Sequence, residues 1–527
     1  MRSTTCEAAP ARRRAGVLLH VTSLPGGHGV GDLGPAARRF LRWLAAAGQG
    51  LWQVLPLAPT GYGDSPYAAL SAFAGNPLLV SLEDLVEEGW LEPGDLADAP
   101  RFERGRADYA RAAAWKGSRL ALAARRFATA GRRSPLHVEA FSRFRGRTRE
   151  WLGDFALYLA LKERHGGRPW FEWDPPLARR EEAALAAARA ALSDAVGVHV
   201  FAQYCFDRQW SRLRAEARQL DIELMGDLPI YLAHDSAEVW ARRELFQLRD
   251  DGRPRAVAGV PPDYFSADGQ LWGNPLHDWA RQAHDRYAFW VDRLRCELSR
   301  FDLVRLDHFR GFEGYWEVPA EATVARDGRW VNGPGAALFE RLEEALGRPL
   351  PLVAENLGVI TPEVEALRER FGFPGMAVLQ FAFGNDPQAE SFRPHNWVRN
   401  LVAYTGTHDN DTAAGWWASE AGPGSTRTPE EVRRERAHAL AYLAADGRDM
   451  PWTLVRAVYA SVAARAVVPL QDLLGLGGEA RMNLPATADG NWRWRARDED
   501  LSPALAERAR ALAALYGRSP GSVSSNQ

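Results

Sequence analysis

The sequence predicts a (β/α)8 barrel with inserted helical and loop subdomains. Eight apolar runs have the length and composition of buried strands, and helical patterns separate many of them. Three of the runs end in an acidic residue, at Asp307, Glu355 and Asp409, about 50 residues apart. Because the carboxyl ends of barrel strands meet at one face, we expect these acids to share one cleft.

The order of the elements supports the barrel. The helical patterns lie at 36–48, 199–220 and 361–372. Alternation of strands and helices predicts a parallel sheet covered by helices, and about eight strands favour a barrel over a doubly wound sheet. The candidate strands are 16–21, 51–57, 222–230, 301–309, 350–356, 377–383, 401–407 and 466–474.

Two long gaps interrupt the barrel pattern. Residues 68–200 include an Ala-, Arg- and Glu-rich region and predict an inserted, mainly helical subdomain. Residues 231–280 are rich in Gly, Pro and aromatic residues and predict loops that cover the cleft, since loops this long are usually functional. We expect one catalytic domain over 13–516, with flexible termini at 1–12 and 517–527.

Charge and cysteine usage restrict the function classes. The 65 basic and 67 acidic residues give a formal net charge of -2, which argues against a nucleic-acid-binding surface. Three widely spaced cysteines form neither a disulfide framework nor a zinc pattern. No signal peptide and no uninterrupted apolar run of about 18 residues is apparent, so we expect a cytoplasmic location.

The segment around Asp307 indicates a permanently charged carboxylate. Arg305 and Asp307 point to the same side of a strand because side chains alternate. A neighbouring guanidinium favours the charged form of a carboxylate, which a glycosyl nucleophile requires. The alternative is a structural Arg–Asp pair inside the barrel.

Glu355 follows an apolar approach that should desolvate its carboxyl and raise its pKa, as a general acid at neutral pH requires. The alternative is a cap on the helix that starts near Thr361.

Asp409 lies in a polar cluster with His408, where both side chains could hydrogen-bond sugar hydroxyls or ligate a metal. Asp227 ends another strand and should also face the cleft, or else cap a turn.

Aromatic residues in Gly- and Pro-rich segments form the last candidate element. They occur at 61–67, 260–265 and 271–275. Sugars present apolar C–H faces and polar edges, so their sites pair aromatic faces with fixed hydrogen-bonding groups. Such segments outside periodic patterns favour a sugar site over core packing.

Six motifs together resemble the amylomaltases, also called disproportionating enzymes or 4-α-glucanotransferases. They are GYGDSPY, GDLPIYLAHDSAEVW, GVPPDYFSADGQLWGNP, RLDHFRGFEGYWEVP, AENLGVITPEVEALRERFGFPGM and THDNDT, and they occur in that order. The resemblance covers nearly the whole chain, to GNWRW at 490–494. It implies a retaining glucanotransferase on a (β/α)8 barrel, acting on α-1,4-glucans, maltooligosaccharides and glucose.

The resemblance also implies roles for individual residues. Asp307 would be the nucleophile, Glu355 the general acid/base, and Asp409 the residue that stabilises the transition state. The residues implied to bind substrate are Tyr62, Ser65, Tyr67, Asp227, Pro261, Trp272, Asn274, Arg305, His308, Phe381, His408 and Asn483. No cofactor or essential metal is implied, and we expect a monomer or weak homo-oligomer.

Two alternative functions remain at this level. A retaining α-glucan hydrolase of amylase type would use the same carboxylates, because these groups do not decide whether water or a sugar attacks the intermediate. A catalytically silent glucan-binding barrel would lack one or more of the three acids, and this sequence contains all three.

Overall fold

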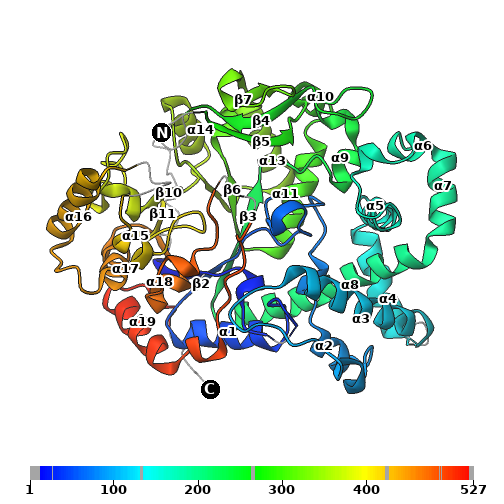
Figure 1. Ribbon diagram of the computed structural model, residues 1–527, viewed down its shortest axis with the longest axis horizontal. Helices are drawn as coiled ribbons and strands as arrows, with labels where there is room; N and C mark the ends of the chain where they lie inside the picture. The colour runs from blue at the N-terminus through cyan, green and yellow to red at the C-terminus, as the bar shows by residue number, and fades with distance from the viewer. Residues whose placement is uncertain are drawn as a thin grey trace, which may run out of the picture.

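Eight parallel strands form the centre of the protein in a computed structural model, which describes residues 12–26, 28–130, 134–262, 268–421, 427–485, 487 and 489–521 (Figure 1). Their order is β10-β11-β12-β1-β2-β3-β6-β9. The strands are β1 (Arg14–Leu18), β2 (Leu51–Gln53), β3 (Glu223–Pro229), β6 (Leu303–Asp307), β9 (Leu352–Ala354), β10 (Gly375–Val378), β11 (Leu401–Tyr404) and β12 (Arg465–Pro469).

The two ends of this sheet meet between β9 and β10. The backbone N–H of Ala354 donates to the carbonyl of Pro374 at 2.9 Å, one residue before β10 begins. The sheet therefore nearly closes, and the predicted (β/α)8 barrel is confirmed. Each of the eight predicted strand segments overlaps one barrel strand.

Several predicted strands extend past the end of the barrel strand, two of them well into a helical segment. The segment 466–474 leaves the sheet after Pro469 and continues as helix α18 (Leu470–Leu474), and 377–383 turns into a 3-10 helix at Leu379–Ala382. Buried helical turns are as apolar as buried strands, so hydropathy alone did not mark these ends.

Helices surround the strands (Figure 1). Among them, α1 (Pro35–Ala46) buries Phe40, Leu41 and Leu44, and α14 (Pro362–Arg370) buries Val364 and Leu367. Others are α11 (Ala288–Arg300), α13 (Gly335–Leu346), α15 (Ala413–Ala418), α16 (Pro429–Leu443), α17 (Met450–Ala460) and α19 (Pro503–Leu515).

The stretch between β2 and β3 is mainly helical and lies beside the barrel (Figure 1). Helix α8 ends this stretch and leads back into β3. The helices are α2 (Leu82–Glu87), α3 (Tyr109–Ala130), α4 (Pro135–Arg147), α5 (Leu152–Arg164), α6 (Pro175–Ala178), α7 (Glu182–Ala191) and α8 (Ser193–Gln219). No single described helix is long and apolar enough to cross a membrane; α7 and α8 meet such a test only as a pair bent by 82°.

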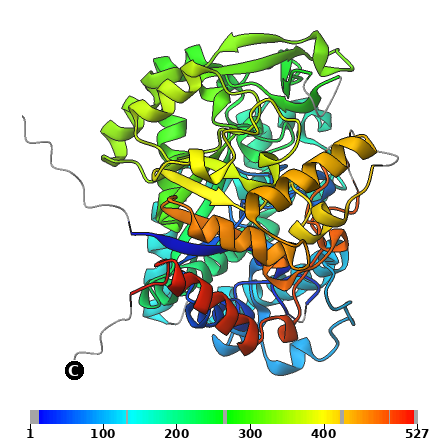
Figure 2. The same ribbon diagram turned by 90° about the vertical axis from the view of Figure 1, so that its left-hand side faces the viewer.

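A second, antiparallel sheet lies at the opposite end of the molecule from α19 (Figures 1 and 2). Its order is β5-β4-β7-β8, and the strands are β4 (Ala256–Val260), β5 (Gln270–Pro275), β7 (Gly314–Pro319) and β8 (Arg329–Asn332). The prediction of loops over 231–280 is wrong for β4, β5, α9 (Ala237–Ala241) and α10 (Trp279–His284). Strand β4 pairs with β7 across more than 50 residues of sequence, a partner that local composition cannot indicate.

The predicted flexible tail differs from the structure at its start. Arg518 is fully buried, and its guanidinium donates to the carbonyls of Tyr459 and Ser461. Residues 517–521 are therefore held against the barrel. Residue 12 is held as well, by an ion pair of 2.8 Å from Arg12 to Asp221. Residues 1–11 and 522–527 lie outside the described residues.

Candidate active site

Four carboxylates stand at the carboxyl ends of barrel strands. Asp227 lies near the end of β3, Asp307 ends β6, Glu355 follows β9 directly, and Asp409 follows β11 by five residues. The parallel register places Asp227 beside Arg305, which fixes the relative height of β3 and β6. The strand order therefore brings these acids to one rim of the barrel.

Arg305 joins two of the carboxylates. One of its terminal nitrogens lies 2.9 Å from Asp307 and donates to both oxygens of Asp227, at 2.8 and 2.9 Å. Arg305 and Asp227 are 5% and 2% exposed, whereas the side chain of Asp307 is 28% exposed. The predicted Arg305–Asp307 pair is present, and Asp307 is the one of the two carboxylates that faces solvent.

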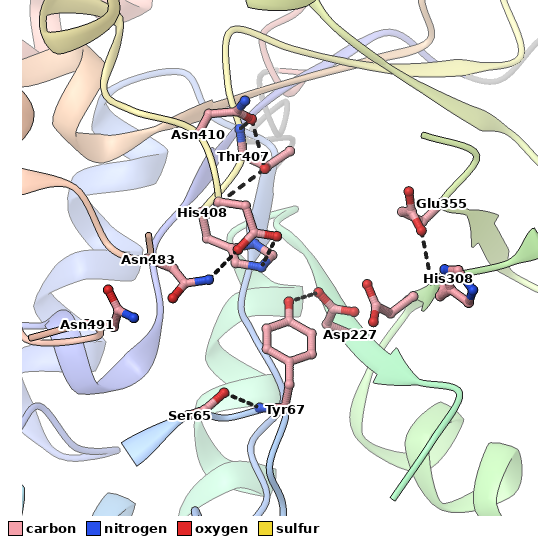
Figure 3. A network of polar contacts seen from close by, with 12 residues as sticks. Ser65, Tyr67, Asp227, His308, Glu355, Thr407, His408, Asn410, Asn483 and Asn491 are labelled. Carbon is pink, nitrogen blue, oxygen red and sulfur yellow. Dashed lines mark hydrogen bonds and ion pairs between the residues drawn. The ribbon is translucent and has the colours of Figure 1, made fainter. Parts of the chain in front are cut away.

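Asp227 does not cap a turn, because its oxygens bind side chains. The hydroxyl of Tyr67 donates to it at 2.8 Å, as Figure 3 shows. Burial raises the pKa of Asp227, and the charge of Arg305 opposes that shift. The structure thus brings Tyr67, Asp227 and Arg305 into one buried network under Asp307.

Glu355 has a different environment. Its carboxyl is 9% exposed, and desolvation raises its pKa to about 7 even though Arg305 acts in the opposite direction. One oxygen accepts the backbone N–H of His308 at 2.7 Å (Figure 3). The other accepts the backbone N–H of Leu357 at 2.9 Å. The predicted rise in pKa is present, and no bond from this carboxyl to the Thr361 end of α14 is seen.

Asp409 is the most open of the acids, with a side chain 47% exposed. The amide of Asn483 donates to one carboxylate oxygen at 2.6 Å, and the ring of His408 lies 3.4 Å from the other. The rings of His408 and Tyr67 stack at 5.1 Å. Among the described residues, no group of three or more His, Cys, Asp or Glu is arranged to hold a metal ion.

The aromatic and loop residues divide into two groups. Trp272 is 38% exposed and presents its ring against the edge of His308, with centroids 4.9 Å apart, so it borders the rim. Asn274, on β5, instead donates its side-chain amide to the carbonyl of Leu232 at 2.9 Å. Phe381 is half-buried and packs edge-on against Phe392 at 5.4 Å.

The remaining predicted residues lie in the connecting segments. The hydroxyl of Ser65 accepts the backbone N–H of Tyr67 at 3.3 Å and so supports the turn that presents that ring. Pro261 is half-buried at the end of β4. The side chain of Tyr62 lies outside the described residues, as do residues 263–267 of the predicted cleft loop.

A family model described as 4-alpha-glucanotransferase matches residues 19–501. The chain belongs to the 4-alpha-glucanotransferase family. A 4-alpha-glucanotransferase of Thermus thermophilus is 52% identical over 509 residues, covering 95% of this chain and 98% of the relative. One of Synechocystis is 47% identical over 510 residues, covering 96% of this chain and 98% of the relative.

Solved structures agree with this family assignment. The amylomaltase of Streptococcus agalactiae, solved in complex with acarbose, superposes with a TM-score of 0.90 at 38% identity, covering 97% of this chain and 100% of that one. The amylomaltase of Corynebacterium glutamicum shares the fold, with a TM-score of 0.72 at 20% identity over 96% of this chain and 74% of that one. The protein is therefore a 4-alpha-glucanotransferase, and the hydrolase alternative is not favoured.

Sequence reasoning missed two residues that contact Asp409, Tyr67 and His408. Arg481 donates to the backbone carbonyl of Asp409 at 2.6 Å. The buried ring of Trp492 lies 6.0 Å from that of Tyr67 and 5.8 Å from that of His408. Both follow β12, where no strand end or acidic residue marks them; the only available signal was the aromatic cluster at 490–494.

Proposed function

We propose that the enzyme transfers α-1,4-glucan segments with retention of configuration, with Asp307 as nucleophile and Glu355 as general acid/base. The observation that carries this assignment is the contrast between the two environments. Asp307 is half-exposed and paired with a buried guanidinium, whereas Glu355 is buried with its pKa raised to about 7. The exposed carboxylate of Asp307 is open to a sugar, whereas the raised pKa of Glu355 suits it to hold and donate a proton.

The reaction then has two balanced steps. A carboxylate oxygen of Asp307 attacks C1 of the donor, the C1–O bond breaks, and Glu355 gives its proton to the leaving oxygen. Glu355, now ionised, takes the proton of the acceptor 4-OH, whose oxygen attacks C1 and releases Asp307. The acceptor is glucose or the non-reducing end of another glucan.

The residues around Asp307 fit the binding of the reacting sugar. Asp409 keeps one oxygen on Asn483 and is nearly half-exposed, so it can accept hydrogen bonds from sugar hydroxyls. We assign His308 and His408 to the same sugar, with Tyr67 and Asp227 beneath it. Tyr62, Trp272, Pro261 and Phe381 are assigned to the glucan chain on either side.

Retention requires a short distance between the two carboxyl groups. In retaining enzymes they lie about 5–5.5 Å apart, against about 6.5–9.5 Å in inverting enzymes. We expect the shorter separation for Asp307 and Glu355 in a crystal structure with a bound oligosaccharide. A separation above about 6.5 Å in that closed complex would remove the nucleophile role from Asp307.

Transfer instead of hydrolysis depends on keeping water from the intermediate. Trp272 beside His308 supports the exclusion of water, because an aromatic side chain at the rim can cover the reacting sugar.

Incubation with pure maltotriose tests the proposal. Transfer yields glucose and longer oligomers at a constant number of reducing ends, whereas hydrolysis raises that number. Asp307→Asn serves as the control and should leave maltotriose unchanged.

We propose maltooligosaccharides, starch chains and glucose as the partners of this enzyme, and a cytoplasmic location. The S. agalactiae relative was solved in complex with acarbose, which supports a carbohydrate ligand for this enzyme. We further propose that residues 13–516 form one catalytic unit that acts as a monomer or weak homo-oligomer, without a cofactor. Sedimentation measures the oligomeric state, and a stable large oligomer would contradict it.

A further inference from the structure

The carboxyl group of Glu355 is held between two backbone segments. Its oxygens accept the N–H of His308, which follows β6, and the N–H of Leu357, which follows β9. Because one donor belongs to each segment, the position of this carboxyl depends on how the two segments lie relative to each other. A shift of either segment would weaken one of these bonds and move the carboxyl.

Arg310 connects the same two segments. It begins helix α12 (Arg310–Glu313), and its guanidinium donates to the carbonyl of Val359. Arg310 lies two residues beyond His308, and Val359 lies two residues beyond Leu357. The side chain of Arg310 therefore closes a link between the segments that carry the two N–H donors of Glu355.

The face of Trp330 covers Arg310. The guanidinium carbon lies 3.7 Å from the ring centroid, and Arg310 is only 9% exposed although Trp330 is 42% exposed. Trp330 lies on β8, at the edge of the antiparallel sheet, and its ring packs edge-on against Trp316 at 5.1 Å. The sheet thus fixes an aromatic face over the guanidinium and keeps water from it, which strengthens a cation–π contact.

We propose that Arg310, covered by Trp330, is a positioning residue that holds the carboxyl group of Glu355 in place for proton transfer. This inference rests on the role of Glu355 proposed above. Neither residue touches the reacting atoms; each acts through the backbone of 308 and 357. A misplacement of about 1 Å at such a site lowers turnover about 100-fold.

The inference also predicts the direction of a pH effect. The two N–H bonds favour the charged form of Glu355, so loosening them raises its pKa further. Arg305 and Asp307 on β6 also face Glu355, and they stay in place when Arg310 or Trp330 is changed. Protonated Glu355 is needed for the first step, so the alkaline limb of kcat/KM should move to higher pH while the maximum falls.

The experiment compares kcat/KM for maltotriose against pH in Arg310→Met, Trp330→Ala and Trp330→Phe. We expect the first two to lose about 10- to 100-fold and to shift the alkaline limb upward, and Trp330→Phe to recover most of the rate because it keeps an aromatic face. Trp330→Ala is the decisive variant, since it removes no charge and alters a half-exposed side chain. Arg329→Leu, next to Trp330 on β8 and paired with Glu317, is the matched control and should behave as wild type.

The melting temperature of each variant shows whether it is folded. In folded variants, three outcomes would overturn the inference. They are wild-type kcat/KM in Trp330→Ala, a loss of rate with an unmoved alkaline limb, or an equal loss in Trp330→Phe and Trp330→Ala. Glu355→Gln separates this failure from failure of the proposed function. If Glu355→Gln stays active on maltotriose, the acid/base role fails; if it is inactive while Trp330→Ala is unaffected, only the positioning role fails.

Discussion

The guanidinium of Arg305 lies 2.9 Å from the carboxylate of Asp307, two residues further along strand β6. The same nitrogen also binds Asp227 on the neighbouring strand, so a single buried cation serves two carboxylates. Asp307 shares this cation with Asp227 and is the more exposed of the two carboxylates. This arrangement is what separates Asp307 from Glu355 in our account.

Removal of Arg305 should cost both stability and activity. Arg305→Leu leaves two carboxylates without their cation, and breaking a buried pair costs about 3–5 kcal/mol. We expect a lower free energy of unfolding in urea and loss of transfer on maltotriose below the unfolding transition. Arg38→Leu is the matched control, because Arg38 pairs at 2.7 Å with the fully buried Asp84 far from the rim. It should lose stability alone; equal loss of activity in both variants would contradict the assignment.

Glu355→Gln should stabilise the protein at alkaline pH. The pKa of Glu355 is raised from 4.5 to about 7 in the folded protein, so its protonated form favours folding. That contribution is complete below pH 4.5 and is lost as the pH rises through about 7. A neutral Gln does not suffer this loss. We expect a gain of up to about 3 kcal/mol at pH 8 and under about 1 kcal/mol at pH 5, measured by urea unfolding at both values. A gain of the same size at both pH values would argue against a buried, charged Glu355.

The pH dependence of the first chemical step should reflect the same group. Protonated Glu355 donates to the leaving oxygen, so kcat/KM for maltotriose should fall about tenfold per pH unit above its pKa of about 7. A glucosyl fluoride donor needs no proton on its leaving group, so its profile should lack this fall. An identical alkaline limb for both donors would assign it to another group.

The sequence predicted the barrel because each buried parallel strand is a continuous apolar run. It missed β5 and β8 of the second sheet because most of their side chains are exposed, which leaves no apolar run to detect. In the site, the strand-end acids and Arg305 were found because they lie in or directly after these apolar runs. Arg481 and Trp492 were missed, because only the path of the chain after β12 brings them into contact with Asp409 and His408. Tertiary contacts of this kind leave no local pattern.

Trp272 should influence the choice between sugar and water. Its ring borders His308, so Trp272→Ala opens the rim to solvent during the lifetime of the intermediate. We expect the share of hydrolysis to rise several-fold while donor cleavage falls less, measured as new reducing ends against glucose released from maltotriose. Leu271→Ala is the matched control, since Leu271 is 41% exposed on the same strand and points to the other face. A rise in hydrolysis in both variants would indicate a general loosening of β5.

Trapping of the glycosyl-enzyme tests the central claim most directly. In Glu355→Gln, a maltosyl fluoride donor can still glycosylate the nucleophile, because fluoride leaves without a proton, whereas the slow second step lets the adduct accumulate. Peptide mass mapping should then place one added maltosyl group on Asp307, and Asp307→Asn should show no adduct. An adduct on Asp227 or Asp409, or full turnover of the fluoride in Asp307→Asn, would contradict the account.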